Sequence, residues 1–116
     1  MSLILIVNSK NFNEKPEQVR ISIGSEIGEY SIMWNSKNKD SPSIEFGYSP
    51  KDLTNKKKGN SVKTTVFKTY KTVNNEVIIN VKKDSKIYYR VANNKKGPWS
   101  QIFGMSKKKK KFIFFL

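Results

Sequence analysis

The side chains with the strongest capacity for chemistry in this sequence are lysines gathered in two runs. The chain carries 23 lysines and arginines against nine acids, a formal net charge of +14. Ammonium groups attract anions, and the release of counterions drives their binding to polyanions. We therefore predict contact with anions or a membrane surface at the following residues: Lys56, Lys57, Lys58, Lys107, Lys108, Lys109, Lys110 and Lys111.

Specific recognition of nucleic acid is not expected from these bases. Only Arg20 and Arg90 are arginines, and both lysine runs fall in predicted loops. Proteins that read or stack on bases use arginine forks and exposed aromatic side chains placed among the basic residues. The sequence predicts weak, salt-sensitive binding to polyanions.

The residue types of the common catalytic sites are missing. The chain has no histidine and no cysteine, which excludes a Ser-His-Asp triad, a cysteine nucleophile, thiolate metal sites and disulfides. A binuclear hydrolytic centre needs clustered His, Asp, Asn or Tyr ligands. The nine acids are scattered along the chain, as solvated strand and turn residues are. We expect no catalytic, cofactor-binding or metal-binding residue.

Apolar and polar residues alternate along several segments, which is typical of half-buried strands because successive side chains point to opposite faces. Val19, Ile21 and Ile23 give the first such pattern. Turns are predicted at residues 74–75 and 83–85, and a solvated connection at 51–60. The predicted strands cover residues 17–23, 30–34, 43–48, 64–73, 77–81, 87–91 and 99–105.

These segments predict an all-β fold without a helix. About seven short strands separated by turn residues are typical of an antiparallel β-sandwich of the immunoglobulin or fibronectin-III-like type. Trp34, Tyr89, Trp99 and Phe103 admit two interpretations in such a fold. They could form an exposed platform for a sugar or a nucleobase, but large aromatic residues at alternate strand positions more often fill the core. We favour the core.

Five fragments also occur in the order and rough spacing of a known family. They are Pro16–Gly24, Tyr30–Trp34, Ile44–Pro50, Tyr88–Val91 and Gly97–Ser100. Together they resemble the N-terminal, fibronectin-III-like domain of purple acid phosphatases. The resemblance implies a domain over residues 16–105, preceded by an extension at 1–15 and followed by a basic and aromatic low-complexity tail at 106–116.

In the resembled family a metallophosphatase domain follows this module. That domain carries the binuclear metal centre, iron paired with zinc, manganese or iron, and hydrolyses phosphomonoesters. A chain of 116 residues suits one compact domain, so we expect a truncated family member without the catalytic domain. The expected function is a non-catalytic structural module whose partner is that domain. The alternative is an autonomous basic adhesion or anion-binding module for a membrane surface or nucleic acid.

One departure from the family pattern concerns a tyrosine. Fibronectin-like domains usually place a corner tyrosine at the start of the sixth strand, and Ile87 stands there. We therefore expect the hydroxyl-to-backbone bond of that corner to be missing.

The tail, residues 106–116, shows neither strand alternation nor a helical face. It could be a basic and hydrophobic membrane-surface anchor. The abrupt change of composition instead favours a second interpretation, in which this segment is translated from AT-rich non-coding DNA and has no function. No apolar run reaches the roughly 20 residues of a membrane span, and residues 2–7 are too short for a secretory signal. The localisation stays open, although the resembled family is commonly secreted or vacuolar.

Overall fold

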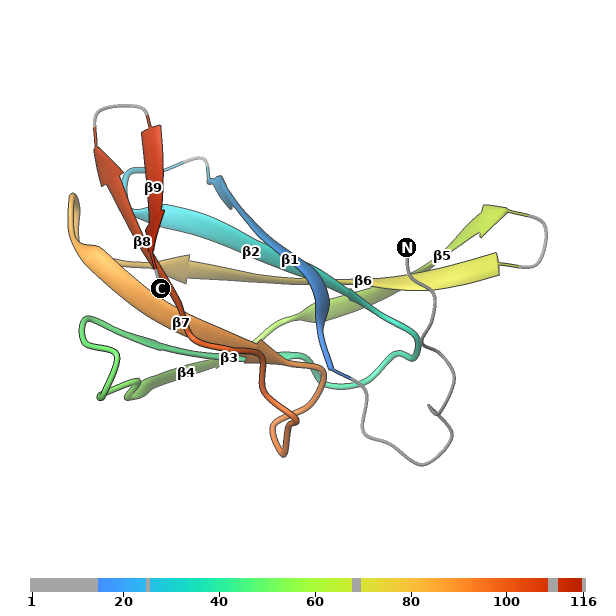
Figure 1. The fold of residues 1–116 in the computed structure, drawn as a ribbon. Helices are drawn as coiled ribbons and strands as arrows, with labels where there is room; N and C mark the ends of the chain where they lie inside the picture. Colours follow the sequence, from blue (N-terminus) through green and yellow to red (C-terminus); the bar gives the residue numbers. More distant parts are fainter. Residues whose placement is uncertain (1–14, 25, 68–69, 109–110, 116) are drawn as a thin grey trace.

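The chain folds into two facing β-sheets (Figure 1). A computed structural model describes residues 15–24, 26–67, 70–108 and 111–115. The prediction of an all-β sandwich is confirmed, although the described residues form nine strands and not about seven. The strands are β1 (Glu17–Ile23), β2 (Glu29–Ser36), β3 (Ser43–Gly47), β4 (Asn55–Lys58), β5 (Asn60–Phe67), β6 (Tyr70–Asn80), β7 (Lys86–Ala92), β8 (Phe103–Lys108) and β9 (Lys111–Phe115).

The strand order explains how the layers form. One sheet has the order β1-β2-β6-β5 and the other β4-β3-β7-β8-β9, and every pairing is antiparallel. Apart from β9, this is the A-B-E-D and C′-C-F-G arrangement of immunoglobulin-type sandwiches. Because the chain changes sheet after β2, β4 and β6, strands that are distant in sequence become neighbours, as β3 and β7 do.

The core lies between the two sheets and follows the predicted alternation. Trp34 and Ile32 on β2 are fully buried, as are Ile44 on β3 and Val91 on β7. Phe103 is half-buried and packs against this cluster. The remaining buried members of the cluster are Tyr30, Phe46, Val77, Ile79, Ile87, Tyr89 and Met105. The side chains of Trp34, Tyr89 and Phe103 therefore belong to the core, as expected.

A side-chain hydrogen bond also links the two sheets inside this core. Nε1 of Trp34 donates to Oδ1 of Asn93 at 2.9 Å, and both residues are buried. Trp34 lies on β2, whereas Asn93 directly follows β7 of the other sheet. The bond gives the polar edge of the indole a partner where water is excluded.

The prediction that residues 51–60 form only a solvated connection is wrong. Residues 55–58 form β4, which pairs with β3 in the register Glu45↔Lys56 and Ser43↔Lys58. Pairing satisfies the backbone groups at the edge of β3, and opposite charges face each other at the Glu45–Lys56 position. Exposed lysines on a short edge strand also hinder pairing with another chain.

The predicted turn at residues 74–75 is also wrong, because both asparagines lie inside the long strand β6. Phe67 at the end of β5 instead pairs with Tyr70 at the start of β6, and residues 68–69 lie outside the described residues. Asn75 is buried and takes part in a side-chain network: Ser61 Oγ donates to its Oδ1 at 2.5 Å, and its Nδ2 donates to Ser36 Oγ at 3.1 Å. These bonds satisfy an amide that would otherwise favour a turn.

The C-terminal strands differ from the prediction as well. The strand expected from residue 99 begins at Phe103, and Trp99 forms only an isolated bridge with Ala92. Beyond residue 106 no strand was expected, yet β8 continues to Lys108 and β9 pairs with it. Gly104 allows this pairing, because a Cβ there would lie 2.4 Å from the ring of Phe115. Residues 109 and 110 lie outside the described residues.

A tyrosine secures the connection between β6 and β7, although Ile87 occupies the usual corner position and is buried in the core. The backbone N–H of Lys82 donates to the hydroxyl of Tyr48 at 3.1 Å, and Nζ of Lys82 lies 5.3 Å from the centre of the Tyr48 ring. Tyr48 directly follows β3, so this contact joins segments that leave different sheets. The hydroxyl-to-backbone bond comes from another position than in the family pattern.

Candidate anion-binding cleft

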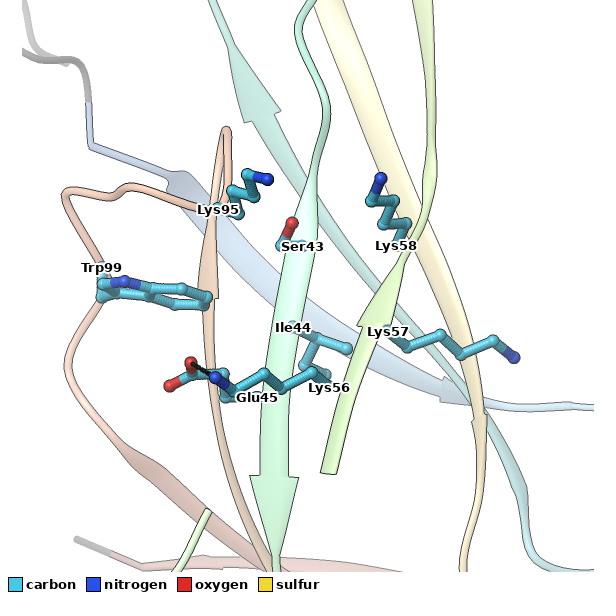
Figure 2. Close-up of a pocket in the computed structure, with 8 residues that line it drawn as sticks. All are labelled: Ser43, Ile44, Glu45, Lys56, Lys57, Lys58, Lys95 and Trp99. Carbon is cyan, nitrogen blue, oxygen red and sulfur yellow. Dashed lines mark ion pairs between the residues drawn. The ribbon is translucent and has the colours of Figure 1, made fainter. Parts of the chain in front are cut away.

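A hollow of the described surface lies on the outer face of the five-stranded sheet (Figure 2). Its volume is about 350 Å³. The floor is β3, one wall is β4, and the other wall is the segment that follows β7. The lining residues are Ser43, Ile44, Glu45, Lys56, Lys57, Lys58, Lys95 and Trp99.

A second hollow of about 370 Å³ adjoins the first. The two hollows share Ser43, Lys58 and Lys95, so they form one elongated cleft with these three residues at its middle. The far end of the cleft is lined by Asp40, Ser41, Asn94 and Lys96.

Strand alternation divides the predicted lysine run at residues 56–58. Lys56 lies beside Glu45, with 3.7 Å between Nζ and Oε2. Lys57 points to the opposite side (Figure 2). Its Nζ donates to the carbonyl oxygen of Ile78 at 2.5 Å. Lys58 lines both hollows. The structure therefore places Lys56 and Lys58 at the cleft but uses the ammonium of Lys57 as a tie to the other sheet.

The second predicted run lies elsewhere on the same sheet. Lys107 and Lys108 end β8, Lys111 begins β9, and residues 109–110 lie outside the described residues. In the sheet order, β3 and β7 separate β4 from this hairpin. The described parts of the two lysine runs therefore belong to strands toward opposite edges of the sheet.

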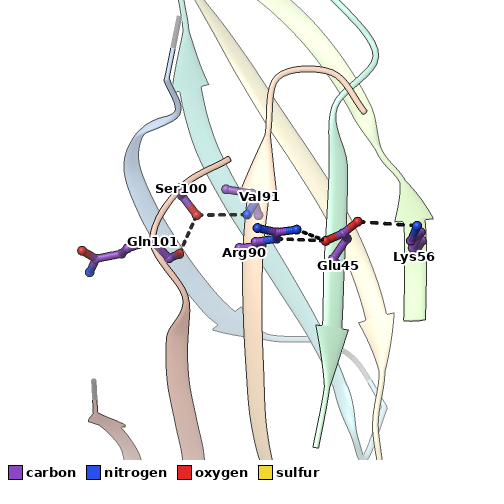
Figure 3. Close-up of polar contacts among 6 residues, drawn as sticks. All are labelled: Glu45, Lys56, Arg90, Val91, Ser100 and Gln101. Atoms are coloured by element: carbon purple, nitrogen blue, oxygen red, sulfur yellow. Dashed lines mark hydrogen bonds and ion pairs between the residues drawn. The ribbon is translucent and has the colours of Figure 1, made fainter. Parts of the chain in front are cut away.

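Glu45 stands at one end of the cleft in a network of charged groups (Figure 3). Its Oε1 accepts from Nε and Nη2 of Arg90 at 2.9 and 2.6 Å. The side chain of Glu45 is only 12% exposed, against 35% for Arg90. Both nitrogens donate to the same oxygen, and these charge-assisted hydrogen bonds hold the guanidinium against Glu45.

Trp99 does not lie in the core, which corrects the interpretation made from sequence. Its ring is half-buried on the outer face, with Cζ of Arg90 4.8 Å from the ring centre. Ser100 fixes this segment beside β7: its N–H donates to the carbonyl of Val91 at 2.8 Å, and its Oγ accepts from the N–H of Val91 at 3.0 Å (Figure 3). Val91 faces the core, so its neighbour Arg90 points outward. Because the bonds to Val91 hold the returning chain against β7, the indole of Trp99 lies next to Arg90 and beside the cleft.

Lys95 and Lys96 contribute to the cleft but were missed by sequence reasoning. Nothing in their local sequence relates them to Lys58, which is far away in the chain. The link is the register of β3: Ser43 pairs with Lys58 on one side and with Ala92 on the other. The residues that follow Ala92 therefore come close to the end of β4. Only the pairing of three strands could have shown this.

Two tyrosines have clearly shifted pKa values, and neither lines the cleft. Burial raises the pKa of Tyr89 to about 12. Burial, and to a smaller extent the negative charge of Asp84, raises the pKa of Tyr30. Both phenols stay protonated at neutral pH and act as core side chains.

Among the residues that the structure describes, no three acidic groups are gathered so that they could hold a metal ion. The described segments also include no helix of the length and apolarity that a bilayer crossing requires. The cleft combines ammonium groups, two carboxylates and one indole, a set of groups that can bind a small polar ligand.

Comparison with known proteins agrees with the resemblance noted in the sequence. A search of individual curated proteins found no match. The family model described as the purple acid phosphatase N-terminal domain matches residues 16–106, which is most of the chain and includes every residue of the cleft. The chain therefore belongs to the family of purple acid phosphatase N-terminal domains.

Proposed function

We propose that this chain is a non-catalytic structural module that packs beside a metallophosphatase domain. The observation that carries the proposal is the family match over residues 16–106. In this proposal the metal-dependent hydrolysis of phosphomonoesters belongs to the partner domain, and the binuclear metal centre lies there. The β-sandwich supplies a firm surface against which that domain folds or is oriented.

The chemistry of the cleft supports a non-catalytic role. The sequence has no histidine or cysteine. The carboxylate of Glu45 already accepts two hydrogen bonds from Arg90 and lies near Lys56. At the other end, Asp40 accepts from the N–H of Ser41 and from Nδ2 of Asn94. Carboxylates held as partners of donors in this way are poorly suited to act as a general base.

The ties between the two sheets support the structural part of the proposal. The Trp34–Asn93 bond and the Tyr48–Lys82 contact join segments that belong to different sheets. A module that supports a second domain needs such internal rigidity. Interfaces between domains of one chain are small, so their formation provides little free energy to offset the entropy lost if the module itself had to become ordered.

A fusion protein tests this proposal. One polypeptide would carry this chain followed by a purple acid phosphatase metallophosphatase domain, and its thermal unfolding would be compared with that of each part alone. We expect the catalytic domain to unfold at a higher temperature in the fusion, because packing stabilises the folded state. The proposal would be contradicted by two independent transitions at the temperatures of the separate parts.

A second candidate function, adhesion to anionic surfaces, is favoured by the net charge of +14 and the lysines of the cleft. Here Lys56, Lys58 and the run Lys107–Lys111 would contact anionic lipid or nucleic acid without sequence preference. The test is sedimentation with vesicles that contain an anionic phospholipid. Binding that persists at about 0.15 M salt supports this function, and its loss there leaves only weak attraction.

A further inference from the structure

We propose that the elongated cleft binds a sugar ring that carries one anionic group, a phosphate, sulfate or carboxylate. The proposal gives the second candidate function, anion binding, a specific site and ligand class. It does not depend on packing against a metallophosphatase domain. Three features of the cleft carry it: two ammonium groups at the middle, a carboxylate at each end and an indole in one wall.

The middle of the cleft is suited to one negative charge. Lys58 and Lys95 come from opposite walls and line both hollows, with Ser43 between them (Figure 2). Within the described part of the chain, neither ammonium group forms an ion pair with a carboxylate. An anionic group bound between them would gain charge-assisted hydrogen bonds that these side chains do not make within the protein.

The ends of the cleft are less favourable to negative charge than its middle, because a carboxylate offsets the cations there, Lys56 at one end and Lys96 at the other. Glu45 lines one end and Asp40 the other. Each carboxylate has neighbouring donors, yet its oxygens keep lone pairs that can accept a hydrogen bond from a hydroxyl group. A ligand with charges at regular intervals, such as a nucleic acid strand, would place phosphates near these acids. A ligand with one central charge and hydroxyl groups on both sides fits this pattern better.

Trp99 supplies a flat apolar wall. Arg90 lies over its ring, and the indole stands beside the floor of the cleft (Figure 2). The C–H groups of a sugar ring are weakly positive and pack on the electron-rich face of an aromatic ring. Binding pockets of this kind combine one apolar wall with a few polar groups that fix the orientation of the ligand.

Tryptophan fluorescence of the full chain provides the assay. Trp34 is buried in the core, so a ligand in the cleft would change mainly the signal of Trp99. The chain would be titrated at about 0.15 M salt with glucose 6-phosphate, glucose 6-sulfate and glucuronate. Glucose and inorganic phosphate serve as controls that each lack one part of the proposed ligand. The three anionic sugars distinguish which acid group the site prefers.

We expect at least one anionic sugar to bind about tenfold or more tightly than either control, since it combines the contacts of both. Lys58→Gln and Lys95→Gln should each weaken that binding by about tenfold. Lys83→Gln removes the same charge from the turn before β7, away from the cleft, and should leave binding unchanged. Because Trp99→Ala removes the fluorescence signal, its loss of binding would be measured by calorimetry.

Three results would overturn the proposal. The first is that inorganic phosphate binds as tightly as the anionic sugars and that Lys83→Gln weakens binding as much as Lys58→Gln and Lys95→Gln do. Binding would then be a general attraction of anions and not a property of the cleft. The second is tighter, Trp99-dependent binding of oligothymidine than of any anionic sugar, which would indicate single-stranded nucleic acid. The third is no binding of the sugars at millimolar concentration. The unfolding of the phosphatase fusion tests the structural function separately.

Discussion

Arg90 lies over the indole of Trp99, with 4.8 Å between its Cζ atom and the centre of the ring. The same guanidinium donates two hydrogen bonds to Oε1 of Glu45. One arginine on β7 therefore orients both the aromatic wall of the cleft and the carboxylate at its end. Because Arg90 is opposite Glu45 in the register of β3 and β7, the arrangement follows directly from strand pairing.

Removal of this arginine should destabilise the sandwich. Arg90→Ala leaves the nearly buried carboxylate of Glu45 with only the more distant Lys56, and it uncovers one face of Trp99. We expect the free energy of unfolding to fall by about 2 kcal/mol, measured by urea denaturation. Arg20→Ala is the matched control, because Arg20 is exposed on the edge strand β1. An equal loss in both variants would contradict the role given to the Glu45–Arg90 pair.

The indole of Trp34 should contribute through both its volume and its hydrogen bond. Trp34→Phe removes the donor to Asn93 and leaves space in the core. The expected loss is about 2 to 3 kcal/mol in the free energy of unfolding. Trp99→Phe should cost about 1 kcal/mol or less, since that ring lies half-buried on the outer face. If Trp99→Phe were the more damaging change, the placement of these two indoles would be wrong.

The hydroxyl of Tyr48 should stabilise the connection between β6 and β7. Tyr48→Phe leaves the N–H of Lys82 without this acceptor. Since the site is exposed to water, the expected loss is about 1 kcal/mol. Tyr88→Phe on the outer face of β7 is the control and should lie within about 0.5 kcal/mol of the unchanged protein. The stability of the two variants would be compared by thermal unfolding. Equal stability of both would contradict a stabilising role for the Tyr48 hydroxyl.

Ionisation of Tyr89 should weaken the fold in alkaline solution. Burial raises its pKa from 10.0 to about 12, so the folded state holds the proton more tightly than the unfolded state does. The resulting stabilisation is fully present below pH 10.0 and is lost as the pH rises through about 12. The loss should amount to roughly 2 to 3 kcal/mol. Tyr89→Phe should lack it when unfolding is followed by circular dichroism between these pH values, and an identical pH dependence would contradict the assignment.

The sequence predicted those parts of the fold in which side-chain alternation decides the structure. Trp34, Tyr89 and Val91 lie in the core because they alternate with polar residues along strands. The pattern fails at β4, where four polar residues form a strand because the edge of β3 offers hydrogen bonds. It fails also at Asn75, whose amide is satisfied by side chains of neighbouring strands. In both cases the cause lies outside the segment itself.

The cleft was harder to predict because its residues meet only through pairing between distant strands. Lys58 could be named from its lysine run, but that run gives no reason why Lys57 should turn to the other sheet. Lys95 and Trp99 reach the cleft because β7 pairs with β3 and Ser100 then holds the returning chain. Trp99 was assigned to the core because large aromatic residues at alternate positions of a predicted strand usually fill it. Its place depends on the turn from Asn94 to Gly97, closed by a backbone hydrogen bond, and on Arg90 over its ring.

The central claim, that this chain is a non-catalytic module, is tested most directly by assaying hydrolysis and metal content together. The full chain would be incubated with iron and zinc, dialysed, and assayed with p-nitrophenyl phosphate at acidic and neutral pH. We predict no hydrolysis above the rate of buffer with the same metals, and metal far below one equivalent of the chain. Sustained turnover that accompanies stoichiometric metal and is lost in a Glu45→Gln variant would contradict the claim.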